Sequence, residues 1–341
     1  MRMVSRDMVG CAESPLATWL VALASAITLS IGHTSIAREP MAALRDGEYH
    51  AVLNGVNEWY RVAGAANHTT PMVIVHGGPG GSSYEFEHTI GPRLERFSTV
   101  VYYDQRGSGH SAVPTDDGAY TIPILVSDIE ALRANLGVER VTLLGFSFGG
   151  WLAAEYAIAH PEHVERLILQ SSMDGDLARM TTYQTYAFAF MATGQRRVEL
   201  ESLAHAAITD VSKRIDDVWN NASRADIDHL LFQSMAVAAE VHRLEAESGE
   251  RNTGKMFRVL LGTPYRQPAL VDDLRKLSVA ALVMVGAHDR NVGVDVSHEI
   301  ADALPHARYV VFGNSAHFPE MEEPEKYAST VRDFLRGELG R

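Results

Sequence analysis

Short apolar runs alternate with longer segments of helical apolar spacing over most of the chain. Residues 48–62 alternate apolar and polar positions around Asn54-Gly55, which predicts a β-hairpin. Buried strands are predicted at residues 71–76, 99–104, the start of 141–151, 164–170, 279–286 and 307–312. Helices are predicted at residues 122–136, from the turn in 141–151 to Pro161, at 294–304 and after Pro324. Strands that alternate with helices predict a mostly parallel sheet of eight strands, covered on both faces.

The alternation stops between residues 174 and 276, where every segment with a clear pattern is helical. The predicted helices are Leu177 to Met191, Val211 to Trp219, Ala225 to about Glu247, and Lys255 to Leu261. This all-helical stretch follows the sixth strand and predicts a cap over the carboxyl ends of the strands, where such sheets bind ligands. The predicted domains are therefore a sheet core at 41–173 and 277–341, and a helical cap at 174–276.

Residues 1–40 have the layout of a leader. Arg2 and Arg6 precede an uncharged apolar run, and Ser35-Ile36-Ala37 follows it as a small-x-small cleavage site. This pattern predicts a secreted or periplasmic protein, and residues 16–32 are nearly long enough to serve as a membrane anchor instead. A chain whose true start is Met41 would be cytoplasmic.

Composition excludes several classes of function. The net charge of −13 argues against nucleic acid as a partner, because phosphate binding requires a basic face. Cys11 is the only cysteine, so no intrachain disulfide can form. It also lies far from any stretch of catalytic character, which argues against thiol catalysis. The 341 residues suffice for one large domain with an insertion.

The most informative stretch is Gly145-Phe146-Ser147-Phe148-Gly149, which fits the G-x-S-x-G pattern of a nucleophile elbow. A serine hydroxyl becomes a useful nucleophile when a sharp strand-to-helix turn presents it to a base. Such a turn crowds the backbone two residues on either side, where Gly145 and Gly149 stand. The helix that follows directs its free N–H groups toward the reaction centre. We therefore predict Ser147 as the catalytic nucleophile.

A serine nucleophile requires a base, and the base requires an orienting acid. The chain has fifteen histidines, and only position can choose among them. His317 follows the last predicted strand and Asp289 follows the strand before it, so both share the sheet edge of Ser147 in the order Ser…Asp…His. We predict His317 as base and Asp289 as its orienting acid. His160 and His163 lack a third ligand, so no metal site is predicted.

A second glycine-rich loop, His76-Gly77-Gly78-Pro79-Gly80-Gly81, follows the strand at 71–76. Glycines let backbone N–H groups approach a developing alkoxide, and we expect the amides of Gly78 and Phe148 to form the oxyanion hole. No Lys-Ser/Thr pair follows the loop, which argues against a phosphate-binding role. The sequence predicts no cofactor.

These motifs together resemble the α/β-hydrolase superfamily, and within it the proline iminopeptidase-like group of serine peptidases. The resemblance spans about residues 48–173 and 277–337. It implies an α/β-hydrolase fold and the removal of an N-terminal residue, often proline, with cap carboxylates holding the substrate's ammonium. The matching stretches are His76 to Gly81, Tyr103-Asp-Gln-Arg-Gly-Ser-Gly-His-Ser111, Gly145 to Gly150, and the loops of Asp289 and His317.

The sequence departs from that group where substrate is chosen. Members often carry Gly and Trp where Phe146 and Phe148 stand, and several carry Glu where Arg290 stands. Their Trp-x-x-Trp-Glu cap signature is absent, which leaves Trp219 alone. Phe146 and Trp219 are the apolar candidates for contacting substrate.

Glu240 and Glu247 are the candidate partners of an ammonium. They lie seven residues apart on one predicted helix face, about 10 Å apart along its axis. A solvated helix face also explains this spacing and is the favoured interpretation.

The sequence therefore predicts a serine hydrolase that acts through an acyl-enzyme on a small molecule or short peptide. Removal of an N-terminal, proline-like residue is the first hypothesis, and esterase, lactonase or amidase activity on a small hydrophobic acyl substrate is the alternative. A non-catalytic ligand-binding protein of the same fold is a third. Haloalkane dehalogenase and epoxide hydrolase chemistry require a carboxylate nucleophile where Ser147 stands.

Overall fold

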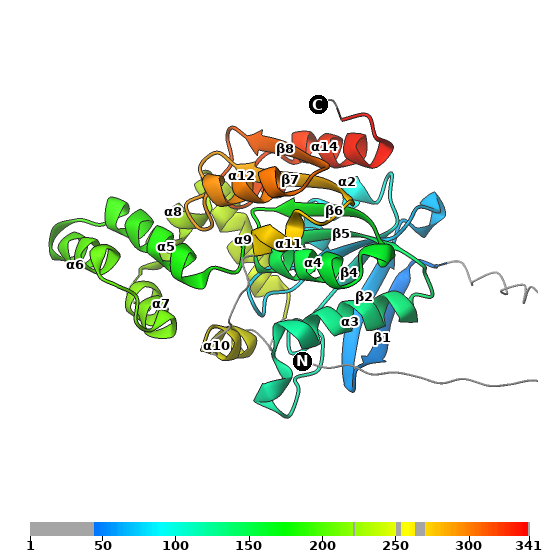
Figure 1. Ribbon diagram of the computed structural model, residues 1–341, viewed down its shortest axis with the longest axis horizontal. Coiled ribbons are helices and arrows are strands. Elements are labelled where there is room, and N and C mark those ends of the chain that lie inside the picture. Colours follow the sequence, from blue (N-terminus) through cyan, green and yellow to red (C-terminus); the bar gives the residue numbers. More distant parts are fainter. Residues whose placement is uncertain (1–43, 221, 250–253, 263–269, 340–341) are drawn as a thin grey trace, which may run out of the picture. The chain divides into compact units, whose positions relative to one another are not determined.

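An eight-stranded mixed sheet forms the centre of the fold, in the order β1-β2-β4-β3-β5-β6-β7-β8 (Figure 1). This computed structural model describes residues 44–220, 222–249, 254–262 and 270–339, so the predicted leader and Cys11 lie outside the described residues. All pairs from β4 onward are parallel, while β1 and β2 run antiparallel to their neighbours. The strands are β1 Gly47–Leu53, β2 Val56–Ala63, β3 Met72–Val75, β4 Val100–Tyr103, β5 Val141–Phe146, β6 Val164–Gln170, β7 Ala280–Gly286 and β8 Ala307–Phe312.

The predicted hairpin is present as β1 and β2. Asn54 and Gly55 connect the two strands with φ values of 45° and 85°. Two successive positive φ values are the mark of a type I′ turn, for which Asn-Gly is the preferred pair. The register pairs Leu53 with Val56 and Gly47 with Val62.

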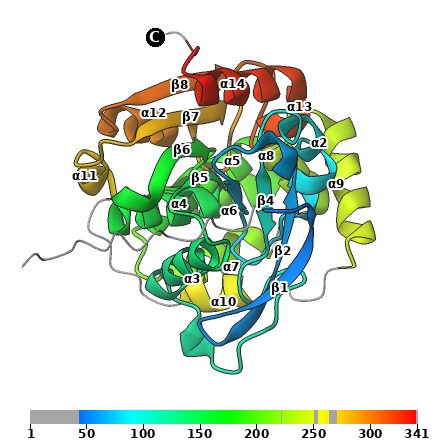
Figure 2. The same cartoon turned by 90° about the vertical axis from the view of Figure 1, so that its right-hand side faces the viewer.

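Helices cover both faces of the sheet, as its alternation with helical segments predicted (Figures 1 and 2). Residues of α3, α4, α11 and α12 pack in one apolar cluster with one face of the strands, and residues of α1, α2 and α14 pack with the other. The helices outside the insertion are α1 Tyr84–His88, α2 Gly91–Leu94, α3 Ile122–Asn135, α4 Phe148–Ala159, α12 Val294–Ala303, α13 Pro319–Glu322 and α14 Pro324–Arg336.

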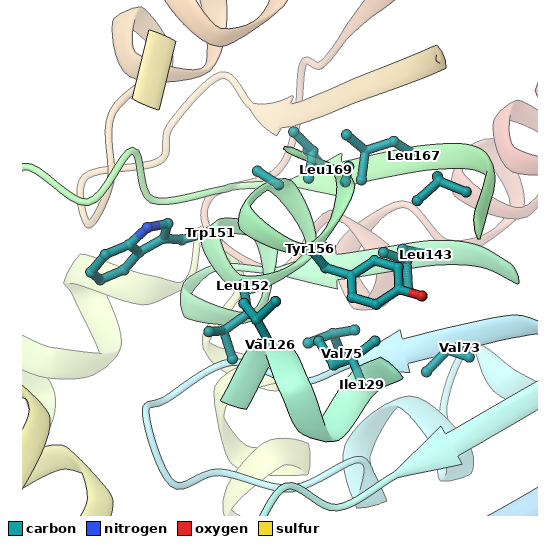
Figure 3. Close-up of a cluster of buried hydrophobic side chains, with 14 of the residues drawn as sticks. Val73, Val75, Val126, Ile129, Leu143, Trp151, Leu152, Tyr156, Leu167 and Leu169 are labelled. Carbon is teal, nitrogen blue, oxygen red and sulfur yellow. The ribbon is translucent and has the colours of Figure 1, made fainter. Parts of the chain in front are cut away.

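The core around α4 shows what holds the turn at Ser147 in place. Figure 3 shows side chains of β3, β5 and β6 meeting side chains of α3 and α4 in one layer. Alternate strand residues reach this layer because successive side chains of a strand point to opposite faces. Both ends of the turn at Ser147 are therefore packed into the core. The labelled residues are Val73, Val75, Val126, Ile129, Leu143, Trp151, Leu152, Tyr156, Leu167 and Leu169.

A helical insertion lies between β6 and β7, after the sixth strand as predicted. Figure 1 shows α5, α6 and α7 gathered beside the sheet. Leu270 and Leu274 of the last helix pack instead into the core cluster of the sheet. The helices of the insertion are α5 Leu177–Met191, α6 Gly194–His205, α7 Val211–Trp219, α8 Arg224–Leu231, α9 Met235–Glu247, α10 Lys255–Gly262 and α11 Leu270–Leu274.

Two details of the insertion differ from the sequence prediction. The single helix expected from Ala225 to Glu247 is two helices, because Phe232 to Ser234 leave the helical conformation. The helices α6 and α11 were not predicted. Over the part of the chain that the structure describes, no helix has the length and apolar character needed to cross a bilayer.

Candidate active site

Ser147 lies at the turn between β5 and α4, in a backbone conformation of φ 55° and ψ −118°. This conformation is rare for a residue with a side chain, and it persists here because the surrounding core holds both flanking elements. The Ser147 N–H donates to the carbonyl of Gln170 at 2.9 Å, which fixes the turn to β6. The close approach that requires glycine is at Gly149, where a Cβ atom would lie 1.9 Å from the carbonyl oxygen of Val75.

Asp289 and His317 lie together after β7 and β8. The Nδ1 of His317 is 2.9 Å from Oδ2 of Asp289, and both side chains are buried. The other carboxylate oxygen, Oδ1, accepts the backbone N–H groups of Asn291 and Val292 at 2.9 and 3.0 Å. Burial by itself raises the pKa of Asp289, but the interactions with His317 and these two N–H groups outweigh it and leave the pKa below its ordinary value. Asp289 is therefore an ionised carboxylate that accepts a hydrogen bond from the Nδ1–H group of His317.

The Nε2 atom of His317 is the ring nitrogen that does not face Asp289, and His317 is not among the residues that line the cavity of Ser147. Within the described residues the hydrogen-bond partner of Nε2 is Nδ2 of Asn291, at 3.2 Å, and not Ser147. Asn291 lines the same cavity as Ser147. The ring of Phe146 packs 5.0 Å from the ring of His317, between the centroids. Phe146 thus supports His317 and is absent from the residues that line the cavity, contrary to its predicted contact with substrate.

The two candidate amides of an oxyanion hole flank Ser147. Gly78 lines the cavity with Ser147 and has a φ of 119°, and a Cβ atom there would lie 2.6 Å from the N atom of Gly81. Phe148 begins α4, so its N–H belongs to the unpaired first turn of the helix. Neither amide has an intramolecular acceptor among the described residues. Both are therefore available to an oxygen at the Ser147 side of the cavity.

The loop that carries Gly78 is held by the neighbouring Asp104–Arg106 segment. Gln105 donates from its side chain to the carbonyl of His76 at 2.9 Å, and its N–H donates to Nε2 of His76 at 3.1 Å. Burial lowers the pKa of His76, which keeps its ring neutral and able to accept this bond. The motifs His76 to Gly81 and Tyr103 to Ser111 are therefore in contact, and the Gln105 side chain positions the glycine loop.

A cavity of about 70 Å³ opens beside Ser147. Its walls come from the glycine loop, from α5, α7 and α10 of the insertion, and from the loop after β7. No charged side chain of the described residues lines it. The lining residues are Gly78, Pro79, Ser147, Met173, Met180, Gln184, Ile215, Trp219, Phe257 and Asn291.

Trp219 lines this cavity, as its predicted role in substrate contact requires, whereas Glu240 and Glu247 do not. Both glutamates lie on an exposed face of α9, where Arg243 pairs with each at 2.5 Å. Their side chains are 45% and 51% exposed. Spacing placed them on one face correctly, but that face is turned to solvent and both glutamates pair with the arginine between them.

Gln184 and Asn291 are cavity residues that the sequence analysis did not identify. Gln184 lies on α5 in the stretch Tyr183–Phe190, whose apolar spacing favours helix core over a substrate-contacting wall. Asn291 follows Asp289 by two residues, and this proximity to the predicted acid was the only signal that could have identified it.

A third ligand-type side chain joins the pair of histidines that the sequence analysis set aside. Ligand atoms of Glu130, His160 and His163 lie within 4.8 Å of one another. However, both carboxylate oxygens of Glu130 already accept bonds from Arg133, and one also accepts the Tyr156 hydroxyl at 2.7 Å. The guanidinium occupies the positions that a cation would need, so this cluster works as an ion-paired surface network.

Comparison with known proteins agrees with this geometry. The family model of the alpha/beta hydrolase fold matches residues 70–324, and the chain belongs to this family. A proline iminopeptidase of Lactiplantibacillus plantarum is 27% identical over 292 residues, which cover 83% of this chain and 98% of that protein. The chain is an α/β hydrolase with distant similarity to proline iminopeptidases over most of its length.

Two solved structures show the same fold. A proline iminopeptidase-related protein from Thermus thermophilus has a TM-score of 0.72 at 22% identity, over 87% of this chain and 99% of that one. An enol-lactonase from Burkholderia xenovorans has a TM-score of 0.62 at 21% identity, over 84% of this chain and 100% of that one. The fold is thus shared with hydrolases of different substrates.

Proposed function

We propose that this protein is a serine hydrolase that forms an acyl-enzyme with a small, uncharged acyl group. The observation that carries the proposal is that Ser147 lines a small cavity with no charged side chain among the described lining residues, and that Asn291 of the same lining lies 3.2 Å from His317 of the buried Asp289–His317 pair. The strained turn at Ser147 and the two free amides beside it supply the remaining parts of an acyl-transfer site.

The proposed reaction follows from the positions of these groups. Ser147 Oγ attacks the substrate's carbonyl carbon while its proton passes to Nε2 of His317. The carbonyl oxygen becomes an alkoxide that accepts the N–H groups of Gly78 and Phe148. The intermediate then collapses, and the leaving group takes the proton from Nε2. Water repeats the sequence on the acyl-enzyme and regenerates Ser147, while Asp289 stabilises the imidazolium in both halves.

The residues that line the cavity indicate which kind of acyl group it accepts. The cavity volume of about 70 Å³ is small, which favours a compact acyl group such as a short branched chain or a five-membered ring. Met173, Met180 and Ile215 supply an apolar surface for it. An ammonium buried there would lose its hydration without a carboxylate to replace it, which costs several kcal/mol.

Removal of N-terminal proline is the second candidate function. The similarity to proline iminopeptidases favours it, and a prolyl ring fits the size of the cavity. The side chains of Gln184 and Asn291 are polar groups of the lining that such a ring nitrogen would meet. The absence of charged side chains from the described lining favours the neutral acyl substrate.

Steady-state and burst kinetics with matched substrates test both candidates. Wild type, Ser147→Ala and the control Ser329→Ala are assayed with p-nitrophenyl acetate, p-nitrophenyl butyrate and prolyl-naphthylamide. We expect a burst of one p-nitrophenol per chain in the wild type and the control, and a loss of about a thousandfold or more in Ser147→Ala. Ester turnover with an inert prolyl amide supports the neutral acyl substrate, and the reverse supports the iminopeptidase. Equal rates in wild type and Ser147→Ala would contradict both.

A further inference from the structure

A continuous chain of hydrogen bonds runs from the cap to His317. The indole Nε1 of Trp219 donates to Oε1 of Gln184 at 2.9 Å, and Nε2 of Gln184 donates to Oδ1 of Asn291 at 2.7 Å. Nδ2 of Asn291 then lies 3.2 Å from Nε2 of His317, whose Nδ1 faces Asp289. Gln184, Asn291 and His317 are buried, and Trp219, Gln184 and Asn291 line the cavity beside Ser147.

The direction of this chain is fixed at its outer end. An indole N–H can only donate, so the oxygen of Gln184 must face Trp219 and its NH₂ group must face Asn291. The same reasoning turns the oxygen of Asn291 toward Gln184 and its NH₂ group toward His317. Reversing either amide would bring two N–H donors together inside a closed space, which costs the desolvation of both groups. Nε2 of His317 therefore faces a donor.

A donor at Nε2 opposes the step that makes Ser147 a nucleophile. Nε2 must accept the proton of Ser147 Oγ, and the resulting N–H would then point at the N–H of Asn291. The bond from Asn291 is not needed to select the tautomer, because Asp289 already holds the proton on Nδ1 at 2.9 Å. We propose that Trp219, Gln184 and Asn291 form a latch that withholds Nε2 of His317 from Ser147 until substrate fills the cavity.

Substrate opens the latch by replacing its acceptor. Gln184 and Asn291 are polar residues in a cavity lining that is otherwise largely apolar. A substrate oxygen beside them accepts the Asn291 N–H in place of Nε2, and Nε2 then turns to Ser147. This inference rests on the proposed function. It adds that the substrate must carry a hydrogen-bond acceptor, because this acceptor releases Nε2 of His317 and so allows the reaction to begin. Gln184, Asn291 and Trp219 are positioning residues that act through His317.

The test measures how fast Ser147 reacts with a small ethyl fluorophosphonate, which does not depend on the natural substrate. The hydroxyl oxygen of Ser147 attacks phosphorus, fluoride leaves, and the proton goes to His317. A hydrogen bond within a protein makes a modest net contribution to free energy, so Ser147 should be labelled about fivefold faster in Asn291→Ala than in wild type. Trp219→Phe should label about twofold faster, because both amides can then turn over. The matched control Trp59→Phe, a buried tryptophan of β2, should label at the wild-type rate.

A group that merely lined the cavity would slow the reaction or leave it unchanged when removed, so an increase is specific to a latch. The ¹⁵N resonance of His317 Nε2 should shift in Asn291→Ala and in Trp219→Phe, and remain in place in Trp59→Phe. The double variant Asn291→Ala with Trp219→Phe should match Asn291→Ala alone, because the two residues act along one chain. Thermal unfolding of each variant identifies any that fails to fold, and Asn291→Ser then replaces Asn291→Ala.

The outcomes separate the latch from the function on which it rests. Labelling of wild type with unchanged or slower labelling of Asn291→Ala would overturn the latch and leave the serine hydrolase intact. An unmoved Nε2 resonance in Trp219→Phe would also overturn it. If wild type is labelled no faster than Ser147→Ala, the proposed function fails and the latch fails with it.

Discussion

Glu322 accepts the backbone N–H of Ser234 at 2.7 Å, and this bond ties the start of α9 to the end of α13. The same oxygen accepts the N–H of Gln233 at 2.7 Å, and the other carboxylate oxygen accepts the N–H of Ala316 at 2.6 Å. The N–H of His317 itself donates to the carbonyl of Leu231 at 2.9 Å. These hydrogen bonds therefore hold the segment between α8 and α9 against the loop that carries His317.

Replacing Glu322 should weaken the contacts between the α8–α9 segment and the His317 loop. In Glu322→Gln the amide has one acceptor oxygen for three N–H groups, and its NH₂ group faces donors. We expect the free energy of unfolding to fall by about 2 kcal/mol, within the usual range for bonds to a charged acceptor. Hydrolysis of p-nitrophenyl acetate should slow severalfold because the His317 loop loses its support. Chemical denaturation and kcat measure the two effects.

The control for this variant is Glu325→Gln, since Glu325 lies three residues further on and pairs with Arg93 on the surface. Wild-type stability and kcat are expected there. A Glu322→Gln protein with unchanged kcat would show that the contacts of Glu322 do not position His317.

A side chain at position 149 should prevent the catalytic turn from forming. In Gly149→Ala the added Cβ would lie 1.9 Å from the carbonyl oxygen of Val75 and 2.4 Å from that of His76. Both are backbone atoms of the core, which cannot move cheaply. We expect loss of soluble folded protein or a large fall in melting temperature. Gly313→Ala is the matched control, because no atom lies within 4 Å of its Cβ position. Normal folding of Gly149→Ala would contradict the close approach of α4 to β3.

The sequence could predict which residues share one edge of the sheet, because this inference needs only the order and direction of the strands. Ser147, Asp289 and His317 each follow a predicted strand, and parallel strands present their carboxyl ends at one edge. The glycines beside Ser147 were also predictable, since a turn without room for Cβ leaves a clear residue signature. These inferences require no knowledge of which side chains meet.

The sequence could not predict contacts that depend on distant parts of the chain. The helical pattern runs through Phe232 to Ser234 without a break, and the structure ends α8 there because Glu322, 88 residues from Ser234, binds the freed N–H groups. Gln184 and Asn291 are likewise 107 residues apart. Local propensity is overridden in such places by tertiary bonds. The position of Arg243 between Glu240 and Glu247 was, in contrast, a local signal that they pair on the helix surface.

A buried carboxyl group on β2 should make stability depend on pH. Burial first, and then the charge of Asp128, raise the pKa of Glu58 from 4.5 to about 9. Between these values the unfolded chain releases the proton of Glu58 and the folded protein retains it, so this group's contribution to stability is full below pH 4.5 and is lost as pH rises toward 9. Arg106 lies 3.9 Å from Glu58 and lowers its pKa, but it contacts Asp128 more closely, at 2.5 and 2.6 Å, and does not offset the effect of burial.

Glu58→Gln should flatten this dependence. The amide resembles the protonated acid in shape and can still accept the bond that the Tyr103 hydroxyl donates to Glu58. Melting temperatures at pH 5, 7 and 9 should fall less steeply with pH in Glu58→Gln than in wild type. Glu48→Gln, an exposed position of β1, should follow the wild type. Parallel curves for wild type and Glu58→Gln would show that Glu58 ionises normally.

Replacing both Glu240 and Glu247 by Gln should leave catalysis unchanged. An ammonium-binding carboxylate must reach the cavity, whereas both of these groups bind Arg243 on the exposed face of α9. Exposed ion pairs are screened by water and contribute little to stability, so the melting temperature should also stay constant. We expect KM for p-nitrophenyl butyrate, and for prolyl-naphthylamide if it is cleaved, to change by less than about twofold.

Ile215→Phe provides the contrast for that experiment, because Ile215 lines the cavity and a larger side chain there takes up space for the acyl group. In this variant the KM for the butyrate should rise more than the KM for the acetate, since overpacking penalises the longer chain first. A tenfold rise in the KM of prolyl-naphthylamide in the double glutamine variant corresponds to about 1.4 kcal/mol of lost binding. That result, with an unchanged butyrate KM, would place a carboxylate of α9 at the substrate and restore the iminopeptidase as the first candidate.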